Sequence, residues 1–216
     1  MEQAIVQYLP YILSAVVVII SLSVHEFSHG FAAYLLGDDT AKDAGRLTLN
    51  PIRHLDLYGS IIVPAVLLIF KSPFVFAWAK PVPVNPYAMR NPKWGGLLSA
   101  LAGPGSNLVL AIVAAIILKI AYPFYPPNNL LLVFLFECVV INFMLALFNL
   151  VPVPPLDGSR IWSSFLSPRA QHMIEQYAPL IVLGVLLLAY NQISSVISWI
   201  LVSIMVIFGI PFVQLS

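Results

Sequence analysis

His25, Glu26 and His29 form a short motif, HExxH, whose residue types and spacing suit metal chemistry. An α-helix advances by about 100° per residue, so residues four apart share one face and two imidazoles can bind the same Zn²⁺. Glu26 lies one position further round the helix. Its carboxylate can reach a water molecule at the metal and act as a general base without being a ligand. The spacing therefore predicts two ligands and the general base of a hydrolytic zinc site.

The surroundings of the motif strengthen this interpretation. Apolar residues precede it at 16–20 and follow it at 31–36, so the two histidines and the glutamate lie inside a long hydrophobic run. Ionisable groups within a membrane span are costly and usually mark a functional site. The alternative is a polar cluster satisfied by neighbouring helices.

Two histidines do not complete a catalytic zinc site, which has three protein ligands and an open position for water. The other histidines, His54 and His172, lie in polar connectors, and so do most of the carboxylates. Asp157 differs because three prolines, at 152, 154 and 155, end the apolar run before it. Irregular backbone at membrane depth is tolerated where it is buried in protein or faces a water-filled cavity. Asp157 therefore stands out, with a helix N-cap as its alternative role.

The composition identifies the class of protein. Of 216 residues, 60% are hydrophobic and 9% are charged, whereas a soluble domain has roughly 25% charged residues. A soluble fold of this length could not hide so much apolar surface. Ten Lys and Arg against nine Asp and Glu leave a formal charge of +1, and no basic patch favours nucleic acid. We expect a membrane protein with a single domain over residues 1–216.

The apolar segments predict an all-α, polytopic membrane helix bundle. A helix needs about 20 residues to cross the hydrocarbon core. About five stretches approach this length, at residues 8–36, 97–121, 130–151, 178–190 and 193–212. Residues 60–70 are too few for a span and suit a short re-entrant or interfacial segment. The proline-rich connector at 81–86 indicates extended, edge-strand backbone.

The combined motifs resemble the site-2 protease family of intramembrane zinc metalloproteases, peptidase family M50. HExxH in one span and NxxPxPxLDG, at 149–158, after a later span carry this resemblance. Residues 50–56, 79–86 and 102–107 are similar to the short branch of the family, without PDZ or CBS modules. The resemblance implies one Zn²⁺ held by His25, His29 and Asp157, with Glu26 as general base. It implicates Asn149 in substrate or oxyanion contact.

The implied activity is hydrolysis of peptide bonds within or near transmembrane segments. The expected partners are a transmembrane protein or membrane-inserted peptide as substrate, and the lipid bilayer. A transmembrane substrate must unwind locally before attack, and the 81–86 edge could hold it by strand addition. A plain structural connector is the alternative for this segment. Two other functions stay open: a non-proteolytic membrane metal-binding or transport protein, and a pseudoprotease that binds substrates without cutting them.

The positions of the motifs also predict a topology. HExxH lies in the second half of its span, and Asp157 follows the end of a later span, so the two can meet if an even number of crossings separates them. Residues 60–70 then do not cross. Nine of the ten Lys and Arg residues fall on one side, all except Lys119, and the positive-inside rule makes that side cytoplasmic. We expect an integral multi-pass protein of a prokaryotic cell membrane with its site toward the cytoplasmic half.

Overall fold

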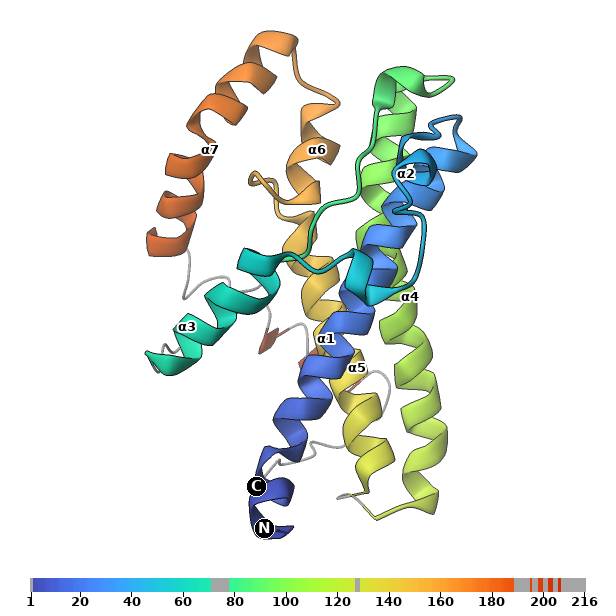
Figure 1. Ribbon diagram of the computed structural model, residues 1–216, viewed down its shortest axis with the longest axis vertical. Coiled ribbons are helices and arrows are strands. Elements are labelled where there is room, and N and C mark those ends of the chain that lie inside the picture. Colours follow the sequence, from blue (N-terminus) through green and yellow to red (C-terminus); the bar gives the residue numbers. More distant parts are fainter. Residues whose placement is uncertain are drawn as a thin grey trace. The chain divides into compact units, whose positions relative to one another are not determined.

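The computed structural model describes residues 2–70, 78–126 and 129–188, together with single positions at 195, 198, 199, 202, 203 and 206. Within these residues there are helices and loops and no strand, which confirms the predicted all-α class for this part of the chain. Figure 1 shows the α-helices, which are α1 (Glu2–Leu35), α2 (Thr40–Asp43), α3 (Val63–Ile69), α4 (Pro92–Ala121), α5 (Leu130–Leu150), α6 (Asp157–Ser163) and α7 (Pro168–Leu188). Shorter helical turns are η1 (Pro51–Arg53), η2 (Leu57–Ile62), η3 (Pro86–Ala88) and η4 (Tyr122–Phe124).

Three of the described helices are long and apolar enough to cross a membrane: Ile12–Leu35, Pro92–Phe124 and Leu130–Leu150. The predicted number of about five is not reached among the described residues. The predicted span 178–190 lies largely in α7, which is not one of the three. The predicted span 193–212 falls almost entirely outside the described residues. Helix α4 begins earlier than predicted, at Pro92, where the side chain of Asn91 accepts the Trp94 N–H (3.2 Å).

The chain divides into two compact units. The first contains Met1–Ser21 and Pro104–Ser216, and the second contains Leu22–Gly103. Helices α1 and α4 each contribute to both units. The single domain expected from the sequence therefore stays a prediction.

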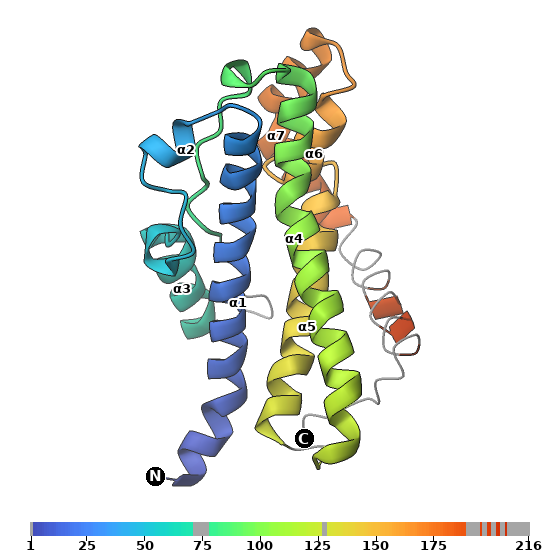
Figure 2. The same ribbon diagram turned by 90° about the vertical axis from the view of Figure 1, so that its right-hand side faces the viewer.

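In the first unit, α4 and α5 lie side by side (Figure 2). Alanines at 111, 114 and 115 on α4 and larger residues on α5 form the buried core, with Leu118 and Leu132 almost fully enclosed. Small residues at this spacing let two helix backbones approach closely. A buried polar contact accompanies this packing: Asn107 Nδ2 donates to Asn142 Oδ1 (2.9 Å) and to the Ser21 carbonyl (3.3 Å). These bonds connect α1, α4 and α5 just before the histidine motif.

In the second unit, Gly37 follows the end of α1, whose last residue is Leu35. Gly37 has a φ of 108°, and the Asp38 N–H donates back to the Ala33 carbonyl (3.0 Å). A left-handed residue and a returning hydrogen bond of this kind end many helices, and glycine adopts that conformation without strain. The buried carboxylate of Asp38 then accepts hydrogen bonds from Thr40 and from the Asn85 N–H (2.6 Å). Burial alone would raise the pKa of Asp38, but these bonds hold it below its ordinary value.

The segment predicted to be re-entrant is short in the structure. It consists of η2, which is a π-helical turn, and α3, which has 7 residues. Its start lies beside the point where the described chain resumes, because Trp78 N–H donates to the Gly59 carbonyl (3.2 Å) and Ser60 Oγ donates to the Trp78 carbonyl (2.8 Å). The indole of Trp78 also covers Gly59 closely enough that a Cβ there would overlap it. Residues 60 and 78 are therefore neighbours, which supports the prediction that the segment does not cross the membrane.

Residues 78–85 form an irregular connector that runs beside the second half of α1 (Figure 2). Lys80 N–H donates to the His54 carbonyl (2.8 Å), and Arg90 N–H donates to the Leu36 carbonyl (3.1 Å). The connector is therefore tied to α1 and to the polar segment that follows α1.

Candidate metal centre

The two histidines of the motif project from one face of α1, as the spacing predicts. Their Nε2 atoms are 3.0 Å apart, and both side chains are buried, with 3% and 6% of their surface exposed. Two ligands at the usual Zn–N distance of about 2.0–2.1 Å around a tetrahedral ion would be separated by roughly 3.3 Å. The imidazoles are thus close to the arrangement in which both Nε2 atoms bind one ion.

Helix α4 orients the second imidazole. His29 Nδ1 lies 2.7 Å from the Ser99 carbonyl, to which it can donate, and Ser99 Oγ donates to the His29 carbonyl (3.0 Å). A proton on Nδ1 leaves the lone pair of Nε2 free for a metal, as in most histidine metal sites. Sequence reasoning missed Ser99. The contact joins residues 70 positions apart in the chain, and no local pattern marks it.

Gly103 makes room for the pair of histidines. A Cβ built at this position would overlap His29 Nε2 and lie 2.7 Å from His25 Cε1. This contact places Gly103 in the packing around the histidines of α1. The missing side chain leaves the space around the two Nε2 atoms open.

We expect the Gly103→Ala substitution to weaken zinc binding about 10–100-fold, the range seen when the groups that orient metal ligands are lost. The added methyl group would displace at least one imidazole from the position in which both Nε2 atoms converge. The measurement is competitive titration of the purified protein with a zinc chelator.

Gly105→Ala is the matched control, because a Cβ at Gly105 meets nothing within 4 Å. It adds the same methyl group to the same helix and should leave the zinc affinity unchanged. Equal zinc affinity in the Gly103→Ala protein would show that the imidazoles do not need this space.

Glu26 is held by the connector. Its Oε2 accepts the backbone N–H of Val82 (2.8 Å). Val82 reaches this position because Gly30, the residue after the motif, has no side chain: a Cβ there would lie 2.9 Å from Val82 Cγ1. The bond fixes the orientation of the Glu26 carboxylate, so the connector positions the candidate general base.

The same contacts decide between the two roles that the sequence left open for residues 81–86. The N–H groups of Lys80, Val82 and Asn85 are already bonded within the unit, and Pro81 and Pro83 have none. The described segment also belongs to no strand. These contacts favour a structural connector over an edge for strand addition.

Asp157 is the first residue of α6 and is buried. The alternative role of N-cap is wrong, because the N-cap of this helix is Leu156 and the helix begins at Asp157 itself. Gly158 explains how the start of α6 fits here: a Cβ at Gly158 would overlap the carbonyl oxygens of Leu150 and Val151 at the end of α5. The LDG sequence thus brings α6 against the end of α5.

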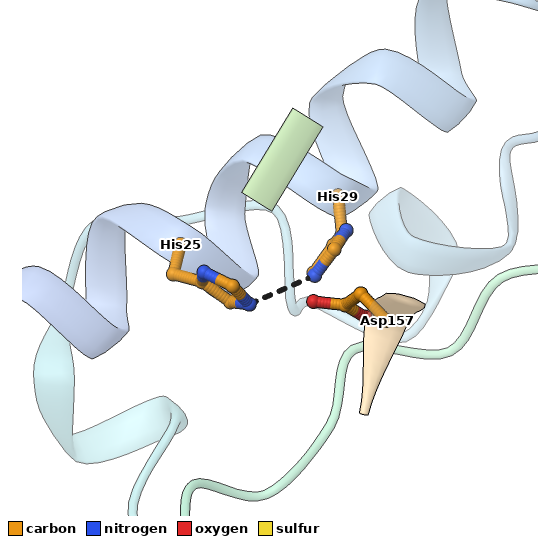
Figure 3. Close-up of side chains that lie close together, drawn as sticks. All are labelled: His25, His29 and Asp157. Carbon is orange, nitrogen blue, oxygen red and sulfur yellow. Dashed lines mark hydrogen bonds between the residues drawn. The ribbon is translucent and has the colours of Figure 1, made fainter. Parts of the chain in front are cut away.

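Figure 3 shows the three predicted ligands, His25 and His29 on α1 and Asp157 at the start of α6. The three residues form a group of ligand types that could hold a metal ion, and each side chain is buried. A pair of imidazoles and one carboxylate is a donor set used by catalytic zinc.

Asn149, His54 and His172 are the other residues that the sequence analysis considered. The Asn149 side chain is half-buried and donates to the Leu145 carbonyl within α5 (2.9 Å). His54 is 2% exposed and is the C-cap residue of η1. Its Nε2 lies 2.7 Å from the Thr48 carbonyl, and it has no part in the histidine–aspartate group. His172 is exposed on α7.

Comparisons with known proteins identify the family. Residues 124–190 match peptidase family M50. The "Putative zinc metalloprotease YwhC" of Bacillus subtilis is 35% identical over 196 residues, which cover 88% of this chain and 85% of YwhC. The "Putative zinc metalloprotease Rip2" of Mycolicibacterium smegmatis is 29% identical over 175 residues, or 64% of its length. "Zinc metalloprotease MJ0392" of Methanocaldococcus jannaschii is 31% identical over 133 residues, or 38% of its length.

No solved structure matches the chain. The curated relatives carry the identification, since YwhC is similar over most of both chains. The three apolar helices and this membrane-protease family together indicate a membrane protein. The chain belongs to peptidase family M50, the site-2 protease family, and is a zinc metalloprotease.

Proposed function

We propose that this zinc metalloprotease hydrolyses peptide bonds within or near transmembrane segments of membrane proteins or membrane-inserted peptides. The observation that carries the proposal is the position of the buried His25 and His29 within Ile12–Leu35, a helix long and apolar enough to span a membrane. Buried ionisable groups at such a depth are costly and are kept for function. A protease with its ligands there is suited to a substrate that also lies in the bilayer.

We assign zinc binding to Nε2 of His25, Nε2 of His29 and a carboxylate oxygen of Asp157. Three protein ligands leave a fourth position open, as a catalytic site requires. When bound, Zn²⁺ lowers the pKa of water toward about 7 and polarises the substrate carbonyl. The contacts of His29 with Ser99 and of both imidazoles with Gly103 support this assignment, because they orient the rings and keep the space open.

Glu26 acts as the general base in this proposal. Val82 N–H holds Oε2, so Oε1 is the oxygen that takes a proton from the attacking water and passes it to the leaving amine nitrogen. A base at a fixed position contributes typically 10²–10⁴-fold to the rate. Because the bond to Val82 comes from the backbone, it does not depend on the side chain at position 82.

Asn149 is proposed to donate a hydrogen bond to the developing oxyanion. Its Nδ2 donates to the Leu145 carbonyl in the structure. The side chain must leave this bond and rotate when substrate binds.

The proposed topology places both ends of the 57–78 segment on the cytoplasmic side. The hydrogen bonds that join residues 59 and 60 to Trp78 support it. So does the positive charge of this region, since cytoplasmic loops are enriched in Lys and Arg. The N-terminus then lies outside, and the loop between α4 and α5 also lies outside.

Single cysteines test this topology in a Cys138→Ser background. Asp43→Cys, before the segment, and Tyr87→Cys, after it, should both escape an impermeant thiol reagent added to intact cells. Phe124→Cys, at the end of the α4 span, should be labelled. All three native residues are exposed, with Tyr87 at 89% and Phe124 at 77%. Outside labelling of Tyr87→Cys without labelling of Asp43→Cys would mean that the segment crosses.

The proposed substrate class is tested by mapping new protein termini in membrane fractions. Cells with the wild-type chain are compared with cells that carry Glu26→Gln. We expect termini within or beside hydrophobic spans in the wild-type cells alone. Termini confined to soluble domains, or identical sets in both cells, would contradict cleavage in the membrane.

A further inference from the structure

A second polar site lies in the second unit, and its lining includes none of the proposed zinc ligands. It is a surface pocket of about 540 Å³. Its lining residues are Ala44, Arg46, Ile52, Arg53, Leu55, Lys80, Pro81 and Pro83. Three of these side chains are cationic, and none is acidic. The pocket therefore has the charge of a site for an anion.

Arg46 is the buried member of the three cations. It is 8% exposed, and its Nη2 donates to the Lys80 carbonyl (2.7 Å). Its Nε is buried without a hydrogen-bond partner. A buried N–H of a cationic group that has no hydrogen-bond acceptor destabilises the fold. A ligand oxygen that accepts from Nε would remove this cost.

No acidic side chain among the described residues forms an ion pair with Arg46, Arg53 or Lys80. The ion pair described nearby joins Lys42 to Asp39 on the exposed surface (3.3 Å). Arg53 and Lys80 are exposed at the pocket rim. None of the three cations at the pocket is therefore in a salt bridge within the described residues.

The pocket borders the connector that positions Glu26. Val82 is buried against Gly30, and its N–H bonds to Glu26. The residues on either side, Pro81 and Pro83, line the pocket. Val82 therefore contacts the general base, while the prolines on either side of it line the pocket.

We propose that this pocket binds a phosphate group, either that of an anionic phospholipid or that of a small soluble phosphate. Arginine presents several N–H donors in a planar fork that matches phosphate oxygens, and lysine adds a point charge. Basic pockets at the cytoplasmic face of membrane proteins bind anionic head groups by the same chemistry. A bound phosphate braces the Lys80–Pro83 stretch and, through Val82, the orientation of Glu26.

The test is isothermal titration calorimetry on the full chain in uncharged maltoside micelles at constant ionic strength. The probes are inorganic phosphate, glycerol 3-phosphate and dioleoyl phosphatidylglycerol, with dioleoyl phosphatidylcholine as the zwitterionic comparison. The pocket variant is Arg53→Gln with Lys80→Gln. The matched control is Arg90→Gln with Arg169→Gln, which removes two exposed cations outside the pocket.

We expect saturable binding of at least one anionic probe to the wild-type chain. Binding should be weakened at least tenfold in the pocket variant and by less than twofold in the control. Saturation by phosphatidylglycerol alone identifies a lipid head group, and saturation by inorganic phosphate or glycerol 3-phosphate identifies a soluble ligand. Failure of every anionic probe to bind, or equal losses in the two variants, would overturn the proposal.

Hydrogen exchange of the wild-type chain provides a second measurement that needs no variant. The probe that binds should slow exchange at the backbone amides of residues 44–55 and 80–82. Unchanged exchange there at saturation would also overturn the proposal.

Discussion

Replacing Glu26 by glutamine is expected to leave zinc in place and to lower the rate of cleavage by about 10²–10⁴-fold, the usual contribution of a general base. Glutamine keeps the size of the side chain, and its oxygen can still accept the Val82 N–H that Glu26 accepts (2.8 Å). It cannot take a proton from water. The measurements are zinc content by mass spectrometry and the initial rate on a single-span membrane protein in liposomes.

Glu137→Gln is the matched control, because it makes the same change on another apolar helix, where Glu137 accepts a hydrogen bond from Ser14 (3.0 Å). It should retain both zinc and cleavage. The same comparison separates the protease from a membrane metal transporter, which does not need a base beside its metal. Full cleavage by the Glu26→Gln protein would show that Glu26 is not the general base.

Removing any one of the three proposed ligands is expected to remove zinc and activity together. The purified wild-type chain should bind about one Zn²⁺, as a single site with three protein ligands requires. His25→Ala, His29→Ala and Asp157→Ala should each lower zinc affinity by more than the roughly 10–100-fold that the loss of an orienting group costs. Zinc per chain after dialysis against a weak chelator measures the effect.

His54→Ala is the comparison for these variants. His54 is buried and bonded to the Thr48 carbonyl, so its loss should lower thermal stability while zinc stays bound. Zinc retained at full affinity by Asp157→Ala and lost by His54→Ala would show that the third ligand is wrongly assigned.

The sequence predicts the chemically specific part of the candidate site. HExxH places two imidazoles on one helical face through local geometry alone, and their Nε2 atoms are 3.0 Å apart in the structure. The prolines before Asp157 mark irregular backbone next to an apolar helix. A carboxylate at such a position is energetically costly and therefore indicates a function. Both signals are local, which explains why they can be seen in an isolated sequence.

The groups that orient the site could not be predicted in the same way. Ser99, Gly103 and Val82 contact the motif from positions more than 50 residues away in the chain. Such contacts depend on how α4 and the connector are placed against α1, and neither position has a periodic pattern that encodes this placement. His54 is a further example, because it lies in a polar connector and yet is buried, with its side chain at the Thr48 carbonyl.

Helices were predicted more reliably than their ends. The apolar runs locate α1, α4 and α5, but α4 starts at Pro92, where the side chain of Asn91 accepts a backbone N–H of the first turn. Helix α7 starts at Pro168, in a polar stretch that the hydropathy pattern left outside a span. Caps and polar first turns lie outside the apolar run that hydropathy detects.

X-ray absorption at the zinc edge of the purified full chain tests the zinc site most directly. The assignment predicts two imidazole nitrogens at about 2.0–2.1 Å, oxygen atoms as the remaining ligands and no sulfur. The spectrum of His54→Ala should be the same as that of the wild type. A third imidazole, or a sulfur at about 2.3 Å, would contradict a centre built from His25, His29 and Asp157.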